Sequence, residues 1–253
     1  MPKKDSFTLK SEPLEQPPQS AAEEAPATPE KVAKPPVVNV RISPPKIQML
    51  DFIIRGTSHL SVNRFSQKAQ EAMETVQKAG STSRSRKTRT PKDFKTLFEQ
   101  AQYVSTEDWR GLHAAGLRNA LISACRLVEF KMTLAKMALF VMADGYDKFD
   151  RTPLLRIYGP DPEMWVGPVR NATGVFDLRA RPRWNPGEWE MRPRIRFDSD
   201  IFTVEDVTNL VSRVGFQVGL GEGRPDSKNS AGLEYGLFEL GHADKQKEDE
   251  KAA

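Results

Sequence analysis

The chain has 253 residues, of which 38 % are hydrophobic, and a formal net charge of +4. This length allows one large domain or two small ones, and the hydrophobic content is enough for a buried core. Cys125 is the single cysteine, which excludes an intrachain disulfide, and its apolar neighbours favour a buried thiol. No run of about 18 apolar residues and no signal-peptide pattern is present, so we expect a cytoplasmic protein without a membrane partner.

The two ends of the chain differ in composition from its middle. Residues 1–36 are dominated by Pro, Glu, Ala, Ser and Lys, which predicts a disordered N-terminal arm. Residues 242–253 form a charged tail, which we also expect to be disordered. The folded part is therefore predicted to be a single α+β domain covering residues 37–241.

The domain opens with short β-branched runs separated by Pro and Gly, which are typical of strands. These strands are expected at residues 37–42, 47–56 and 58–62. A helical pattern follows at residues 63–79. The next segment, loop 80–95, is strongly basic and suited to contact phosphate through Arg84, Arg86, Lys87 and Arg89.

The second half mixes helices and strands without a regular alternation. The clearest helix covers residues 107–128, because Leu117, Leu121 and Ala124 fall on one face. Another helix is expected at residues 203–219, where Thr203 and Asp206 have the spacing of a capping box. Residues 129–145 are either a helix or a helix followed by a strand. Strands are expected at residues 153–159, 172–184, 190–200 and 235–240. This order favours an antiparallel or mixed sheet.

Residues 219–236 (GLGEGRPDSKNSAGLEYG) contain five glycines, and we call this segment the glycine loop. It is not a dinucleotide fingerprint, because a helix precedes it and a strand follows it, and it lacks the spacing of a P-loop. One interpretation is a long turn that needs positive φ angles. The other is a backbone that a phosphate chain approaches closely, with contacts from Gly221, Gly223, Arg224 and Lys228.

Two segments alternate arginine with other residues. Side chains two positions apart on a strand point to the same side, so each segment would present three guanidinium groups on one face. The intervening residues 185–189 suit a hairpin turn, and the pairing of both segments would make a ribbon of six arginines that binds a polyanion. Solvated arginines or internal ion pairs are the alternative. The six residues are Arg179, Arg181, Arg183, Arg192, Arg194 and Arg196.

Catalytic patterns are sparse. His59 and His113 are the candidates for the general base of a metal-independent endoribonuclease, although structural roles for both are the commoner outcome. No Cys and His spacing indicates a zinc site, and we expect neither a metal nor a cofactor.

The order of the last elements carries a family resemblance. A helix (TVEDVTNLVSRVG), the glycine loop and a strand (GLFEL) resemble the C-terminal half of RAMP proteins, the RNA-binding superfamily of CRISPR systems. The stretch LHAAGLRNALISACR is similar to a segment of the backbone subunits of CRISPR effector complexes. The whole chain also resembles bacteriophage proteins of unknown role.

The resemblance implies a ferredoxin-like core whose glycine-rich loop faces RNA. It further implies a bacterial or phage-infected host cell and self-association into a filament. Our first hypothesis is therefore non-enzymatic binding of RNA or another single-stranded nucleic acid. The alternatives are a RAMP-type endoribonuclease and a phage structural or assembly protein that binds an acidic partner.

Overall fold

The computed structural model describes residues 43–64, 93–170, 176–227 and 233–241. The predicted arm at 1–36, the strand at 37–42, nearly all of the helix at 63–79 and the tail at 242–253 lie outside these residues. The same holds for Arg84, Arg86, Lys87, Arg89 and Lys228.

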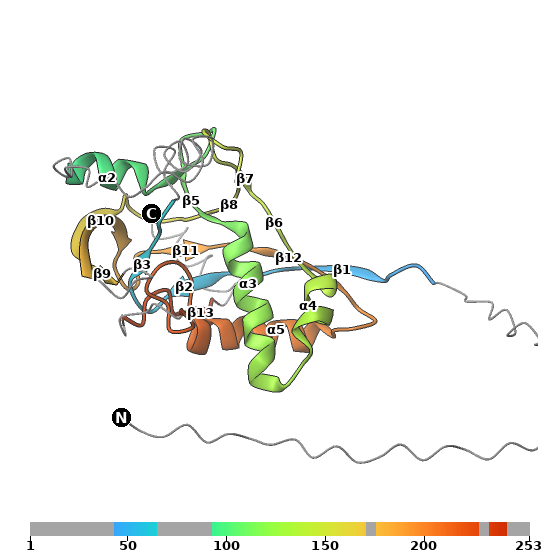
Figure 1. Ribbon diagram of the computed structural model, residues 1–253. Helices are drawn as coiled ribbons and strands as arrows, with labels where there is room; N and C mark the ends of the chain where they lie inside the picture. The colour runs from blue at the N-terminus through green and yellow to red at the C-terminus, as the bar shows by residue number, and fades with distance from the viewer. Residues whose placement is uncertain (1–42, 65–92, 171–175, 228–232, 242–253) are drawn as a thin grey trace, which may run out of the picture. The chain divides into compact units, whose positions relative to one another are not determined.

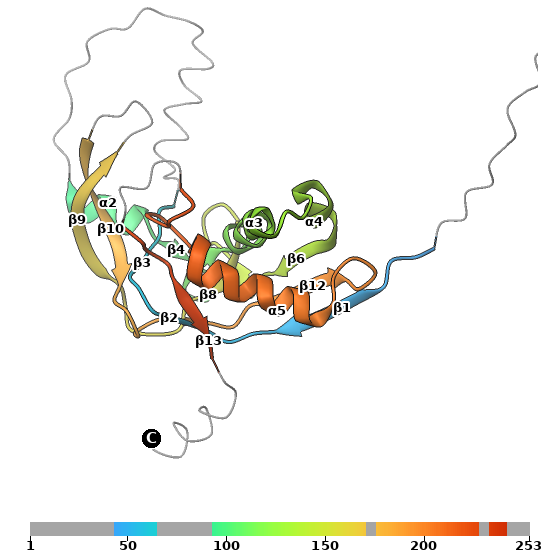
Figure 2. The same ribbon diagram turned by 90° about the horizontal axis from the view of Figure 1, so that it is seen from below.

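An antiparallel sheet supports three of the α-helices of the described chain (Figures 1 and 2), whereas a fourth, α2 at Phe94–Gln100, lies against a different sheet. The supporting sheet has the strand order β1-β12-β6, with β1 at Ile47–Asp51, β12 at Arg194–Asp198 and β6 at Leu139–Met142. One face is covered by α3 (Ala114–Ala124), α4 (Met132–Ala138) and α5 (Val204–Arg213). Ile195 and Phe197 of β12 are buried in the core together with Leu121 of α3 and Val211 of α5, so burial of these apolar side chains joins the two layers.

Three further antiparallel sheets complete the described fold. The second has the order β3-β10-β9, with β3 at Leu60–Ser61, β10 at Phe176–Trp184 and β9 at Glu163–Arg170. The third has the order β11-β2-β13, with β11 at Glu190–Met191, β2 at Ile54–Gly56 and β13 at Phe238–Leu240. The fourth has the order β4-β5-β8-β7, with β4 at Tyr103–Val104, β5 at Arg110–His113, β8 at Pro153–Arg156 and β7 at Gly145–Tyr146. These sheets and helices confirm the α+β class.

The helix predicted at residues 203–219 is confirmed. It consists of α5 and a π-helical continuation, η2, at Val214–Val218. Thr203 and Asp206 form the predicted capping box, in which the Thr203 side chain accepts from the Asp206 N–H and the Asp206 carboxylate accepts from the Thr203 N–H. Val204 is apolar but 48 % exposed, because it is the first helical residue and lies beyond the core.

The prediction of one helix over residues 107–128 is wrong in its first part. Residues 110–113 form β5, which pairs with β8, and α3 begins only at Ala114. Gly111 allows this pairing, because a Cβ there would lie 2.9 Å from the Leu155 carbonyl oxygen. The helix ends in a 3-10 segment, η1, at Cys125–Val128, and Cys125 is buried as expected. Of the two alternatives for residues 129–145, the structure has a helix followed by a strand, which are α4 and β6.

The prediction of one strand over residues 190–200 is also wrong. Its ends belong to two sheets, because Glu190–Met191 form β11 and Arg194–Asp198 form β12. Pro193, which has no N–H to donate to a neighbouring strand, lies at the break. Strand β9 was not predicted. In the described residues no helix combines the length and the apolar character needed to span a bilayer.

Candidate nucleic-acid interface

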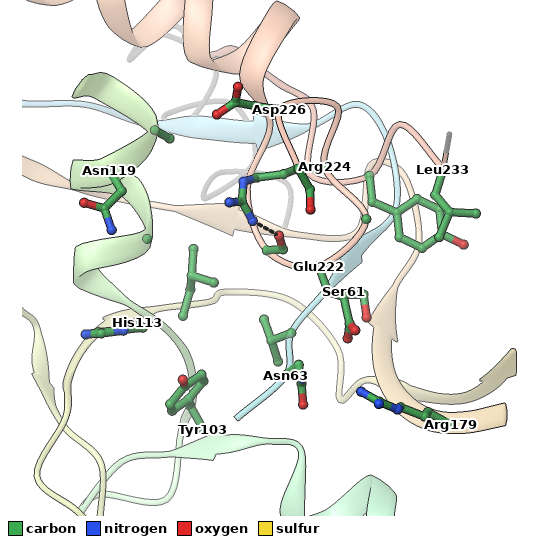
Figure 3. Close-up of a pocket in the computed structure, with 18 of the residues that line it drawn as sticks. Ser61, Asn63, Tyr103, His113, Asn119, Arg179, Glu222, Arg224, Asp226 and Leu233 are labelled. Carbon is green, nitrogen blue, oxygen red and sulfur yellow. Dashed lines mark hydrogen bonds between the residues drawn. The ribbon is translucent and has the colours of Figure 1, made fainter. Parts of the chain in front are cut away.

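A cavity of about 620 Å³ lies between the glycine loop, α3 and the sheet β3-β10-β9 (Figure 3). The face of α3 that borders it carries only small side chains and one carboxamide, namely Gly116, Asn119, Ala120 and Ser123. The other walls come from Arg179 of β10, Trp165 of β9 and residues 221–224 and 226–227 of the glycine loop. Segments that are distant in sequence therefore enclose one concave surface of a size typical for ligand sites.

Positive φ angles explain the glycines of the described loop. Gly219, Gly221, Gly223 and Gly236 have φ values of 73°, 71°, 81° and 74°, a region that L side chains adopt only with strain. A Cβ on Gly221 would lie 2.2 Å from the Ser61 carbonyl oxygen. The positive φ that the turn interpretation requires is therefore confirmed at these four positions, and Gly219, Gly221 and Gly236 lie close to the protein's own backbone.

Backbone hydrogen bonds attach the glycine loop to residues 59–61, which include strand β3. Glu222 N–H donates to the Ser61 carbonyl over 2.8 Å, and Gly236 N–H donates to the His59 carbonyl over 2.6 Å. Leu220 N–H donates to the Gly236 carbonyl over 3.0 Å, which holds the two arms of the loop together. The cavity wall is therefore anchored at several points along its length.

Ion pairs attach the glycine loop to strand β10 and to the 3-10 segment η1. Glu222 pairs with Arg181 of β10, with 2.5 Å between Oε2 and Nε. Asp226 accepts a hydrogen bond from the Ser123 hydroxyl at 2.5 Å and pairs with Arg126 of η1. The carboxylates of Glu222 and Asp226 are thus neutralised by arginines from the surrounding elements.

Arginines and carboxylates both line the cavity. Arg179 and Arg224 line it, and Arg224 donates from Nη1 to the Gly221 carbonyl over 3.0 Å. The two lining carboxylates, those of Glu222 and Asp226, are paired with Arg181 and Arg126, which lie outside the lining. Guanidinium groups at a cavity wall are suited to an anionic ligand.

Aromatic and imidazole rings lie at the cavity wall. The rings of Trp165 and Tyr235 meet edge to face with their centres 6.1 Å apart, and those of Tyr103 and His113 lie 6.2 Å apart. Burial lowers the pKa of His113 below its usual value, against the opposing effect of Asp150. Burial also raises the pKa of Tyr103, so at neutral pH both rings are uncharged.

The arginines of β10 lie near the cavity, but they contact different groups. Arg179 lines it, whereas Arg181 is 5 % exposed and its guanidinium is held by Glu222. Arg183 lies 3.9 Å from the Glu163 carboxylate and stacks over the Trp165 ring at 5.8 Å. Internal ion pairs, the alternative interpretation of this row, therefore account for Arg181 and Arg183.

The predicted ribbon of six arginines is not formed. Strand β10 pairs with β3 and β9, and β12 pairs with β1 and β6, so the two arginine segments belong to different sheets. Because Ile195 points into the core beneath α3, Arg194 and Arg196 project from the opposite face, away from the cavity.

The arginines of the second segment contact their own neighbours. Arg192 pairs with Glu190 and stacks over the Tyr158 ring at 4.8 Å. Arg194 lies 3.7 Å from Asp144. Arg196 stacks over the ring of Phe140 at 5.3 Å. The tertiary structure thus separates the second arginine segment from the glycine loop, and the shared surface is reduced to the β10 side.

The two candidate histidines are separated by the fold. His113 lines the cavity as the residue just before α3, and not within the helix as predicted. His59 is not among the lining residues, and its ring packs against Tyr235 with centres 5.4 Å apart. His113 is therefore the candidate base that the geometry retains.

Sequence reasoning missed most of the lining residues, among them Asn63, Tyr103, Gly116 and Asn119. The spacing of Gly116, Ala120 and Ser123 offered a signal, because these small residues recur on one helical face. Among the described residues, no cluster of three or more His, Cys, Asp or Glu side chains is arranged to hold a metal ion.

Comparison of the sequence with models of protein families gives no match, and comparison with curated proteins gives none either. The interpretation of the cavity therefore depends on its geometry and chemistry.

Proposed function

We propose that the protein binds single-stranded nucleic acid, RNA in the first instance, in the cavity beside the glycine loop, and that it does so without catalysis. One observation carries the proposal: Arg179 of the predicted arginine strand and Arg224 of the glycine loop line the same cavity.

The physical argument combines charge and shape. Guanidinium groups make strong bidentate contacts with phosphate, and rings such as Trp165 and Tyr103 offer surfaces for unpaired bases. A cavity of about 620 Å³ lies in the size range of ligand sites and can admit unpaired bases. Binding of this kind is weakly sequence-specific and falls steeply with salt.

The finer fold assignment belongs to the same proposal. A RAMP-like, ferredoxin-like core is supported by α3 and α5 on one face of an antiparallel sheet, and by the order of α5, glycine loop and β13. We extend the proposal, on the resemblance alone, to a cytoplasmic protein of a bacterial or phage-infected cell that associates along its nucleic acid.

Gly116 offers a direct steric test. It lies in α3 on the cavity side, and a Cβ there meets only Leu112 Cγ at 4.0 Å, so the helix itself accepts a side chain. Gly116→Leu should fold at least as stably as the wild type, because glycine disfavours a helix interior by about 1 kcal/mol. The same change places a bulky apolar side chain in the cavity, so it should weaken binding of a fluorescein-labelled 20-nucleotide RNA at least tenfold in an anisotropy titration.

The second part of the experiment removes one positive charge from the protein, either inside or outside the cavity. Arg179→Ala should weaken binding and reduce the salt slope by about 0.7, the value for one phosphate contact on a single strand. Arg213→Ala, at the end of α5 and outside the cavity lining, removes the same charge and is the matched control. Absence of binding at low salt, or full affinity in Gly116→Leu, would overturn the proposal.

An endoribonuclease is the second candidate, favoured by the position of His113 in the cavity wall. A neutral imidazole is the form that accepts a proton from a ribose 2′-hydroxyl. Incubation of end-labelled RNA with the wild type and with His113→Ala tests whether the protein cleaves RNA. Fragments that appear only with the wild type would support cleavage, and intact RNA after long incubation excludes it.

A further inference from the structure

The walls of the cavity carry different side chains, as Figure 3 shows: the glycine-loop side holds Arg224 together with the carboxylates of Glu222 and Asp226, whereas the lining residues of α3 are uncharged. Arg224 and Arg179 lie on the side of the glycine loop and β10, whereas Asn119 and His113 lie on the side of α3. If the proposed function holds, phosphates occupy the arginine side, and the bases of the same strand turn toward α3.

The α3 wall is built to meet a flat, uncharged group. Gly116 and Ala120 leave the helix surface low, and the Ser123 hydroxyl is engaged by Asp226. Asn119, which is exposed, is the one member of this face with a long polar side chain. Its carboxamide places a donor and an acceptor side by side at the edge of that low surface.

From this arrangement, and resting on the proposed function, we infer that Asn119 is a specificity-determining residue that reads the edge of a base, with adenine preferred. A carboxamide pairs bidentately with adenine, donating to a ring nitrogen and accepting from the exocyclic amine. A carboxylate cannot donate, and its two acceptors match the adjacent N–H groups of guanine. The side chain at position 119 therefore sets which base is preferred.

The test uses four RNA 11-mers of equal charge: U11, and the same oligomer with a central A, C or G. In competition anisotropy, the wild type should bind the A-containing oligomer about fivefold more tightly than the others. Asn119→Ala should bind all four equally. Asn119→Asp should bind more weakly throughout but rank the G-containing oligomer first.

Asn209→Asp is the matched control, because it makes the same change on an exposed face of α5, outside the cavity lining. It should keep the wild-type ranking. Equal binding of all four oligomers by the wild type, or an unchanged ranking in Asn119→Asp, would overturn the inference while leaving the proposed function intact. Failure of the wild type to bind any oligomer at low salt would instead remove the proposed function itself.

Discussion

Arg181 of β10 and Glu222 of the glycine loop form an ion pair whose arginine is almost completely buried, with 5 % of its surface exposed. The pair joins the two sequence features that were each predicted to contact a polyanion. The ion pair gives Arg181 a structural role and holds the loop at the cavity wall. Arg179, two residues earlier on the same strand, is the one that lines the cavity.

Removal of the carboxylate should therefore destabilise the fold. Glu222→Ala leaves the Arg181 guanidinium buried without its counter-ion, and we expect a loss of about 2–3 kcal/mol in the free energy of unfolding, measured by urea denaturation. The double variant Arg181→Met with Glu222→Ala should recover part of that loss, because no uncompensated charge remains. Equal stability of Glu222→Ala and the wild type would show that the pair contributes nothing.

The loop glycines give a second prediction. Gly236→Ala combines a φ of 74° with a Cβ that would lie 1.9 Å from the Leu220 carbonyl oxygen, so the loop must move. Gly187→Ala has a φ of 79° but no heavy atom within 4 Å of its Cβ, so it isolates the conformational strain. We expect about 1–2 kcal/mol of destabilisation for Gly187→Ala and clearly more for Gly236→Ala in thermal or urea unfolding. Equal effects would contradict the close packing of the loop.

The capping box of α5 predicts a pH dependence of stability. Hydrogen bonds from the Thr203 backbone and side chain lower the pKa of Asp206, so its stabilising contribution is complete above the unfolded value of about 3.9. That contribution is lost as the pH falls from there through the lower folded value. The stability difference between wild type and Asp206→Asn should be constant from pH 5 to 7 and shrink below about pH 4. Thr203→Ala should cost about 1 kcal/mol at neutral pH.

His113 predicts how ligand affinity changes with pH. Because burial lowers its pKa, the ring is neutral at pH 7 and gains charge only below its usual value of about 6.5. If a polyanion occupies the cavity, affinity for RNA should rise as the pH falls from 7 to 5. Anisotropy titrations of His113→Asn should show a flatter profile over the same range. An identical rise in the variant would assign the effect to other groups.

Local patterns in the sequence accounted for much of the secondary structure. The helix at 203–219 was predictable because its apolar spacing and its capping box depend only on residues that are close together in the sequence. The helix followed by a strand at 129–145 was left open by the sequence, since short apolar runs do not distinguish the two states.

The pairing of strands was not predictable in the same way. Residues 110–113 continue a helical pattern, yet they form β5 because β8 offers them hydrogen bonds across a long stretch of chain. The alternation of arginines at 178–184 and 190–197 indicated extended backbone, but it contained no information on which strands would lie beside each segment.

The sequence by itself therefore determined the extended arginine segments, the capped helix and the need for positive φ in the glycine loop. Only the tertiary structure decided which arginines meet that loop, because the cavity is made by contacts between distant residues. Arg181 and Glu222 are 41 positions apart, and Ser123 and Asp226 are 103 apart. Such contacts form when apolar layers bury each other, and no periodicity within one segment encodes the partner against which it packs.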